Sequence, residues 1–469
     1  MKQAQISRSR IKSFRKAFSG RVIEPSDPQY DQARKVWNNM IDRRPALIAQ
    51  CTGAADVVEA LRFARENEWL VAVRGGGHSV AGYAVCDGGM VVDLSPMRKV
   101  EVDPQARTVR VEAGARWAEV DRATQPFGLA TPGGEVSETG IAGLTLGGGV
   151  GYLRRKYGLS CDNLLSVDLV TAEGRIITAN QSENADLFWA LRGGGGNFGV
   201  VTTFTYRLHP VGPEVMTLNP FYPITEAGRL LSSWREFIAA APEEATTAFA
   251  IWEVPRHPDI PENLHGTNVC LFDGMYAGPP GAGEEVFRPL RELNGAILDL
   301  SGRVSYIEAQ SAFDAFMPDG GLYYWKSLFL NELSDDAIDA IVSRAANRPN
   351  SRILVIIRHL GGAIDRVAGD GTAYHNRGAQ FMLSIDGAWT DPAENDRNIA
   401  WIRQFWEDMQ RFSTGGVYLN FPGFGEGEDN LWQASHGANY ARLAMVKHKY
   451  DPTNFFRMNQ NIPPAQPTT

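Results

Sequence analysis

The chain has few of the features that mark metal-binding, secreted, membrane or nucleic-acid-binding proteins. Its four cysteines, Cys51, Cys86, Cys161 and Cys270, form no CxxC pair and no Cys/His cluster, so neither a zinc site nor a disulfide framework is expected. No run approaches 18 apolar residues, and the basic N-terminus lacks the apolar segment of a signal peptide. The net charge of −8 comes without a basic stripe. These absences favour a reduced, cytoplasmic protein without a metal, membrane or nucleic-acid partner.

Local patterns in the first part of the chain predict short strands and scattered helices. Residues 54–67 have the spacing of an amphipathic helix, and 69–74 form a short apolar strand that ends in glycines. Residues 99–112 and 165–179 each contain two strand-like runs joined by a turn, which is typical of a hairpin. Hairpins mixed with helices indicate an α+β fold and not a doubly wound parallel sheet.

The middle of the chain, roughly 211–415, predicts a second α+β unit. Its strand-like runs are 324–330, 353–358 and 380–386, and its helical stretches are 335–345 and 395–411. Residues 7–18 predict a short, solvated basic helix, and 432–464 a helix followed by a turn-rich segment. With 469 residues, of which 43% are hydrophobic, the chain is long enough for two or three domains.

One glycine-rich stretch matches a dinucleotide-binding fingerprint only in its letters. Gly194, Gly196 and Gly199 have the G-x-G-x-x-G spacing, but VVTTFTYRL follows them, and its alternation predicts a strand. The fingerprint requires a helix at that point. A Walker A loop is excluded because no glycine run continues into GK[ST]. A Rossmann-type site is therefore not expected.

The more informative loop is RGGGHS, residues 74–79, directly after the predicted strand 69–74. Successive glycines allow backbone N–H groups to close around an anion such as a pyrophosphate. The alternative is a tight structural turn in which His78 is an ordinary loop histidine. A second stretch, residues 140–151 (GIAGLTLGGGVG), is compatible either with close-packed core backbone or with a wall beside a flat aromatic ring.

Four segments together carry a resemblance to a known family. They are RGGGHS, TGIAGLTLGGGVGYLRRKYGLSCDNLLS, DLFWALRGGGGNFGVVT and YDPTNFFRMNQNIPP. In this order they resemble the bacterial type of berberine-bridge-enzyme-like FAD-linked oxidases, within the vanillyl-alcohol-oxidase superfamily. The resemblance implies a PCMH-type FAD-binding domain of two subdomains at 1–210, an α+β substrate domain with an antiparallel sheet at 211–415, and a segment at 416–469 that completes the FAD site.

The resemblance also implies FAD as the cofactor, held by a single covalent bond from His78 to the flavin 8α-methyl group. Many relatives have a second bond through a cysteine, where this chain has Val136. Thr139 occupies the family position that controls access of oxygen to the flavin. The residues expected to bind FAD are Arg74, Gly75, Gly76, Gly77, His78, Ser79, Gly82, Gly134, Thr139, Gly140, Gly143, Gly148, Gly149, Val150, Gly199, Val200, Tyr418, Asn420 and Asn459.

Catalysis is expected from Tyr418, Thr139 and Asn420. Tyr418 and Asn420 (VYLNF) alternate as on one face of a strand and resemble the family's Y-x-N motif, in which the tyrosine is the base. Because a tyrosine pKa lies near 10, either a nearby cation or the charge balance of the reduced flavin is needed, and Lys326 and Arg358 are the candidates for the cation. The alternative for both is a solvated or salt-bridged position on the sheet.

Several further residues receive weaker expectations. Asp386 is a less favoured base, and only one of the adjacent Tyr323 and Tyr324 can face a cavity. His375 receives no catalytic role. Asn459 and Asn461 are expected either to close the flavin site or to cap turns.

The expected activity is an oxidase reaction on a small organic substrate, with molecular oxygen as the second substrate and hydrogen peroxide as product. An alcohol, a sugar hydroxyl or a C–N bond would be oxidised. The alternatives are an oxygenase acting on an aromatic or polyketide-like metabolite, a dehydrogenase with another acceptor, and a flavin-binding protein without catalysis. The sequence indicates neither the substrate nor the oligomeric state.

Overall fold

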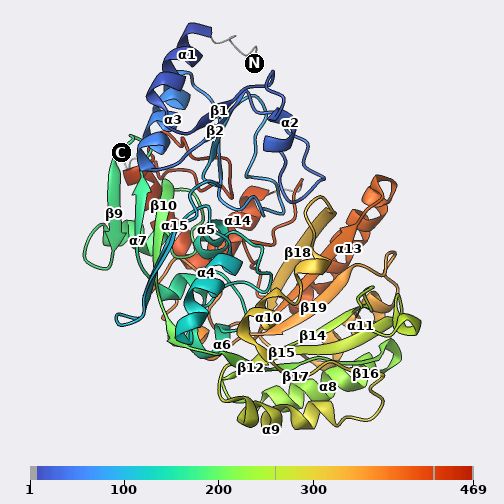
Figure 1. Cartoon of the computed structure of the whole chain (residues 1–469). Coiled ribbons are helices and arrows are strands. Elements are labelled where there is room, and N and C mark those ends of the chain that lie inside the picture. The colour runs from blue at the N-terminus through green and yellow to red at the C-terminus, as the bar shows by residue number, and fades with distance from the viewer. Residues whose placement is uncertain (1–7, 259, 426–427, 467–469) are drawn as a thin grey trace.

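The structure is a computed structural model that describes residues 8–258, 260–425 and 428–466. Two smaller sheets from the N-terminal part of the chain lie beside a large sheet formed by its middle part (Figure 1). The C-terminal helices return to the N-terminal part (Figure 1). No helix among the described residues is long and apolar enough to cross a membrane.

The first sheet has four strands in the order β1-β2-β4-β3, namely β1 (Arg21–Ile23), β2 (Leu47–Gln50), β4 (Met90–Asp93) and β3 (Val71–Arg74). β2 and β3 both run parallel to β4. Helix α3 (Ala54–Glu66) leads from β2 to β3 and confirms the helix predicted at 54–67. The parallel pairs could not be predicted from local patterns, because their partners lie far apart in the sequence.

The second sheet has five strands, all antiparallel, in the order β5-β6-β10-β8-β9. The bounds are β5 (Val100–Asp103), β6 (Thr108–Glu112), β8 (Leu164–Val170), β9 (Ile176–Asn180) and β10 (Val200–Arg207). Both predicted hairpins are confirmed, and β10 pairs between them. Because β10 directly follows Gly199, the strand predicted after the glycine fingerprint is also confirmed.

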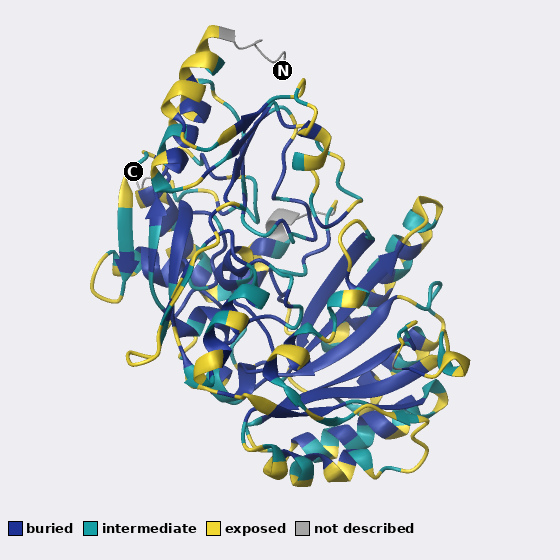
Figure 2. Cartoon of the chain, in the orientation of Figure 1, coloured by how far each residue is buried: buried dark blue, intermediate teal, exposed yellow. Residues whose placement is uncertain are grey.

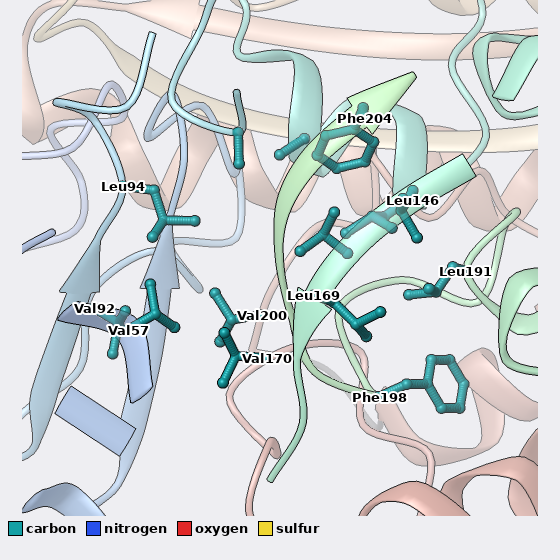
Figure 3. Close-up of a cluster of buried hydrophobic side chains, with 14 of the residues drawn as sticks. Val57, Val92, Leu94, Leu146, Leu169, Val170, Leu191, Phe198, Val200 and Phe204 are labelled. Atoms are coloured by element: carbon teal, nitrogen blue, oxygen red, sulfur yellow. The ribbon is translucent and has the colours of Figure 1, made fainter. Parts of the chain in front are cut away.

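These two sheets share one hydrophobic core. Val57 of α3 and Val92 of β4 face Val170 and Val200 of the second sheet (Figure 3). Helix α1 (Arg8–Ala17) confirms the predicted basic helix, but it is not merely solvated: Phe14 is buried and its ring lies 4.6 Å from that of Phe63. Burial of such apolar surface provides the main stabilisation of this part of the molecule.

Nine antiparallel strands form the large sheet. Its main path is β16-β13-β15-β14-β19-β20-β18, and β12 pairs with β15 and β17. The bounds are β12 (Glu214–Leu218), β13 (Pro220–Pro223), β14 (Ala245–Glu253), β15 (Asn268–Tyr276), β16 (Leu298–Asp299), β17 (Gly302–Ser305), β18 (Leu322–Leu330), β19 (Leu354–His359) and β20 (Phe381–Trp389). The three predicted strands are β18, β19 and β20; the other six were not predicted.

Helices α8 (Ala227–Ile238), α9 (Pro280–Arg291), α11 (Asp335–Ala346) and α13 (Asn395–Met409) pack on one face of this sheet. β14, β18, β19 and β20 are buried along all or nearly all of their length (Figure 2). β18 and β20 are buried along their whole length, which explains why they read as continuous apolar runs. The remaining elements are α2 (Tyr30–Ala33), α4 (Trp117–Thr124), β7 (Leu129–Ala130), α5 (Ile141–Leu146), α6 (Arg154–Tyr157), α7 (Ala185–Ala190), β11 (His209–Pro210), α10 (Tyr306–Ser311), α12 (Ala363–Arg366), α14 (Glu428–His436) and α15 (Tyr440–Tyr450).

A buried lysine attaches the C-terminal segment to the N-terminal part. Lys447 Nζ, on α15, donates to the backbone oxygens of Asn197 (2.7 Å) and Phe456 (2.8 Å) and forms an ion pair with Asp451 (2.7 Å). Both charged side chains are fully buried. The pair therefore joins the glycine loop before β10 to the segment that follows α15.

We expect the substitution Lys447→Met to lower the free energy of unfolding by about 3–5 kcal/mol, because it leaves the Asp451 carboxylate buried without its cation. Lys449→Met is the matched control on the same helix: its pair with Asp186 is exposed, and its loss should cost at most about 1 kcal/mol. Urea unfolding followed by tryptophan fluorescence measures both. Equal effects of the two substitutions would contradict the assignment.

Candidate active site

Three distant parts of the chain enclose a cavity of about 280 Å³. The N-terminal part contributes the glycine loops, the large sheet contributes side chains of β18, β19 and β20, and the C-terminal part contributes residues 418–422 and 456–460. The cavity thus lies where the two halves of the molecule meet. Most of the residues singled out in the sequence line it.

The RGGGHS loop leaves the end of β3 and borders the cavity from Gly75 to Ser79. Arg74 does not line the cavity. Its buried guanidinium instead pairs with Asp93 on β4 (Nη2 to Oδ2, 2.6 Å) and donates to the backbone oxygen of Ala33 (2.7 Å). Arg74 therefore holds the base of the loop in place.

The two glycine-rich stretches touch each other at Gly76 and Gly140. A Cβ atom on Gly76 would lie 2.4 Å from the Cα atom of Gly140, so neither position accepts a side chain. Gly77 has φ +72°, a conformation that favours glycine. The loops therefore present bare backbone to the cavity, as an anion-binding nest requires.

His78 lines the cavity with an unusual lack of partners. Both ring nitrogens are buried, and neither has a hydrogen-bond partner among the described residues, whereas buried polar atoms are generally bonded. The imidazole stacks on Trp37, with ring centres 5.1 Å apart. Burial lowers the pKa of His78 to about 4, so the ring is neutral at physiological pH.

The second glycine-rich stretch has two roles. Gly134, Thr139, Gly140, Gly143 and Val150 line the cavity, as do Gly199 and Val200 from the start of β10. Three glycines expected to bind the cofactor do not line it. Gly82, which lies outside this stretch, is packed against Ile41, whereas Gly148 and Gly149 within it are packed against Tyr374 and Ser160. The wall and the close-packed backbone, taken above as alternatives, are thus both present in one stretch.

Tyr418 and Asn420 line the cavity, but the strand predicted for VYLNF is wrong. Residues 416–420 have an irregular backbone, and the Tyr418 N–H donates to the Ser327 side chain (3.0 Å) instead of to a neighbouring strand. Alternation alone does not make a strand when no partner is available. The two side chains still meet, because Asn420 Nδ2 donates to the Tyr418 hydroxyl oxygen (2.9 Å).

Three N–H groups converge on the Tyr418 oxygen. Besides Asn420, the backbone N–H groups of Gly149 and Val150 donate to it, each at 3.1 Å. Burial raises the pKa of Tyr418 to about 12, and the three donors oppose this shift. Donors of this kind stabilise a phenolate without the cation that the sequence suggested.

Of the two candidate cations, Arg358 lines the cavity and Lys326 does not. Lys326 was predicted as one of two possible partners for Tyr418, but its Nζ lies 3.8 Å from the centre of the Trp406 ring, on the helix-covered face of the sheet. Its neighbour Ser327 faces Tyr418, and successive residues of a strand face opposite sides. Arg358 lines the cavity and donates to Glu135 (2.8 Å) and Ser384 (2.7 Å).

Asp386 offers a second proton acceptor in the cavity. Its Oδ2 accepts a hydrogen bond from Ser384 (3.1 Å), while its buried Oδ1 has no hydrogen-bond partner in the part of the chain that the structure describes. Burial is the main cause that raises the pKa of Asp386 to about 6, so the carboxyl is ionised at neutral pH. Trp325 and Leu354 are its register partners on the adjacent strands and line the same cavity.

Of the two adjacent tyrosines, only Tyr323 lies on this face, where it stacks on Trp37 at 3.8 Å; Tyr324 packs in the core on the other face. Asn459 lines the cavity and donates to the backbone oxygen of Gly196 (3.1 Å). His375 lies against Gly437, away from the cavity lining.

Sequence reasoning missed most of the apolar lining. These residues come from separate strands and loops, and no local motif marks them. They are Trp37, Phe313, Met317, Trp325, Leu354, Ile356 and Phe421. Glu135, which accepts hydrogen bonds from both Arg154 and Arg358, was missed for the same reason.

The residues of the cavity fit FAD. Bare glycine backbone suits a pyrophosphate, an apolar wall suits a flat ring, and an unpartnered neutral imidazole lies between them. This combination defines a flavin-binding oxidoreductase.

Comparisons with known proteins identify the family. The sequence matches the FAD binding domain family over residues 45–180 and the berberine and berberine-like family over residues 417–463. The uncharacterized FAD-linked oxidoreductase YgaK of Bacillus subtilis is 33% identical over 460 residues, which cover 96% of this chain and 98% of the relative. The (R)-6-hydroxynicotine oxidase of Paenarthrobacter nicotinovorans is 30% identical over 473 residues, covering 96% and 97%.

Among solved structures, 6-hydroxy-D-nicotine oxidase from Arthrobacter nicotinovorans superposes with a TM-score of 0.85 at 28% identity, over 96% of this chain and 98% of that one. The chain therefore belongs to the berberine-like FAD-linked oxidoreductases. The α+β fold class expected from the sequence, a PCMH-type FAD-binding part with a central antiparallel substrate sheet, is confirmed.

Proposed function

We propose that this protein is an FAD-dependent oxidase that carries FAD on His78 and oxidises a small organic substrate. The observation that supports this most directly is the buried imidazole of His78, whose two nitrogens lack partners in a glycine-walled cavity. When bound, FAD supplies a ring that accepts a hydride from a substrate carbon and passes the electrons to molecular oxygen, which leaves hydrogen peroxide. A cytoplasmic location is part of the proposal, since all four cysteines are free.

His78 supplies the single covalent attachment. The neutral ring is a nucleophile, and its stacking on Trp37 fixes its orientation. Val136 stands in the cavity where many relatives have a cysteine, and its side chain cannot form a second bond. The alkyl side chain leaves attachment to His78 alone.

Tyr418 is the proposed base for the substrate hydroxyl or amine proton. The N–H groups of Gly149, Val150 and Asn420 stabilise the charge on its oxygen when the proton moves. Thr139 lines the same cavity and has the compact shape of valine, which leaves room for oxygen beside the ring. Asp386, with its free Oδ1, is the second candidate for the proton acceptor.

The substrate is proposed to be an alcohol, a sugar hydroxyl or a C–N bond. The named relatives include a 6-hydroxynicotine oxidase and a carbohydrate oxidase from Microdochium nivale, so the family spans these chemistries. The aromatic side chains Phe313, Trp325 and Phe421 around Asp386 favour a ring-containing substrate. That lining also supports the second candidate function, oxygenation of an aromatic or polyketide-like metabolite.

We expect the purified protein, after photoreduction without air, to be reoxidised within seconds in air-saturated buffer with one hydrogen peroxide formed per flavin. A peroxide-coupled screen over sugars, alcohols, amines and phenols then identifies the substrate. Reoxidation over minutes would instead indicate a dehydrogenase. Labelled oxygen found in the organic product would indicate an oxygenase.

The substitution His78→Ala should release all flavin on acid precipitation, whereas the unsubstituted protein should keep it in the pellet. Because the pKa of His78 is about 4, attachment of FAD to apoprotein should keep its rate between pH 7.5 and pH 5.5. A histidine with an ordinary pKa of about 6.5 would be mostly protonated at pH 5.5, and the rate would fall about tenfold. A fall of that size, or extractable flavin in the unsubstituted protein, contradicts attachment through a buried neutral His78.

Tyr418→Phe should lower kcat by about 10²–10⁴-fold, because it removes the proton acceptor while the flavin stays attached. The activity of Asp386→Asn is the comparison, since amide and carboxylate have the same shape. If the Asn substitution costs more than the Phe substitution, Asp386 is the base and the assignment to Tyr418 is wrong.

A further inference from the structure

The Asp314 carboxylate, in the large-sheet half of the molecule, binds the segment that contains Val136 and Thr139. Asp314 Oδ1 accepts the backbone N–H of Ser137 (2.8 Å), and Asp314 Oδ2 accepts the Ser137 hydroxyl (2.6 Å). Ser137 lies between Val136 and Thr139, and both of these line the cavity. Asp314 therefore binds the residue next to Val136, which lines the cavity.

The N-terminal part of the chain holds the same segment as well. The N–H groups of Ala118 and Trp117, at the start of α4, donate to the backbone oxygens of Ser137 (2.8 Å) and Thr139 (3.1 Å). From the large-sheet half, Asp314 bonds Ser137, and Gln310 on α10 donates to the backbone oxygen of Gly134 (3.3 Å) at the beginning of the segment. Residues 134–139 are thus hydrogen-bonded to both halves of the molecule.

The Asp314 side chain does not cap the short helical turn to which it belongs. That turn spans Asp314–Phe316 and has no side-chain cap, while both carboxylate oxygens reach across to Ser137. Phe313 and Met317 on either side of Asp314 line the cavity. The Asp314 carboxylate therefore links the cavity wall at Phe313 and Met317 to the segment at residues 134–139.

We propose that Asp314 is a positioning residue that holds Ser137 and thereby keeps Val136 and Thr139 back from the centre of the cavity. This inference rests on the proposed function, because its effect is on the reaction with oxygen. Without the carboxylate, Ser137 loses its hold from the large-sheet half and keeps its contact to α4. The half-buried Val136, which packs against the aromatic cluster around Trp325, can then shift and occlude the space beside Thr139.

The test compares four single variants and one double variant, Asp314→Ala with Ser137→Ala, all of which carry flavin. Asp314→Ala removes both hydrogen bonds, Ser137→Ala removes one, and Asp314→Asn preserves both because an amide can accept the N–H and donate to the hydroxyl. Glu308→Ala is the matched control: it removes a carboxylate that caps α10 in the same region and accepts the backbone N–H of Ser305.

Two measurements are made without substrate. The first is deuterium uptake by the peptide containing residues 134–139, which should rise in Asp314→Ala and stay unchanged in Glu308→Ala. The second is reoxidation of photoreduced protein by air, which should slow about tenfold in Asp314→Ala through misplacement of the segment, with an unchanged flavin midpoint potential. Ser137→Ala should slow it less, Asp314→Asn should restore it, and the double substitution should equal Asp314→Ala alone.

Unchanged reoxidation in both Asp314→Ala and Ser137→Ala overturns the proposal, as does equal slowing in Glu308→Ala. If Asp314→Ala does not fold, Ser137→Ala decides alone: it must slow reoxidation while its midpoint potential stays unchanged. Failure of the proposed function is recognised separately, because the unsubstituted protein would then lack attached flavin or would not react with oxygen.

Discussion

The cavity depends on one buried arginine that joins the two halves of the molecule. Arg154, directly after the second glycine stretch, donates to the backbone oxygens of His359 (2.8 Å) and Thr247 (3.1 Å) in the large sheet. It also pairs with Glu135 (3.1 Å) beside the cavity. Desolvation lowers the pKa of Arg154 and the Glu135 carboxylate opposes that shift, so the charge is held by its partners. Because Glu135 also pairs with Arg358, the sheet wall and the glycine wall share one charged junction.

This junction places charged groups on one side of the cavity, whereas the lining around Trp325 is apolar. The Arg154 guanidinium is tolerated in its buried position because its donors find acceptors, which include fixed backbone oxygens of two strands. Arg154 thus holds the large sheet against the glycine loops through main-chain oxygens. Side-chain substitutions elsewhere in the sheet leave these oxygens in place. The apolar residues around Trp325 and Phe421 can then vary in shape without shifting the sheet against the glycine loops.

The sequence predicted local features well and long-range ones poorly. The hairpins at β5-β6 and β8-β9, helix α3 and the loop at 74–79 depend on spacing within a few residues, so periodicity and glycine chemistry were sufficient. The parallel pairing of β2 and β3 with β4, and six strands of the large sheet, depend on partners far along the chain. Lys326 illustrates the limit. It was considered as a cation for Tyr418, but the face of the sheet on which it lies is set by strand register, which local patterns do not show. For residues 416–420, alternation was present but no partner strand was, and the predicted strand did not form.

The attachment of the C-terminal segment has a consequence for the order of events in biosynthesis. Residues 456–460 line the cavity, and Gln460 donates to the backbone oxygen of Leu419 (2.6 Å), which lines it as well. During translation the glycine loops emerge hundreds of residues earlier and have no complete pocket to enclose. The complete pocket therefore forms only after the C-terminal segment has been synthesised, and the early sheets must remain folded or protected until then.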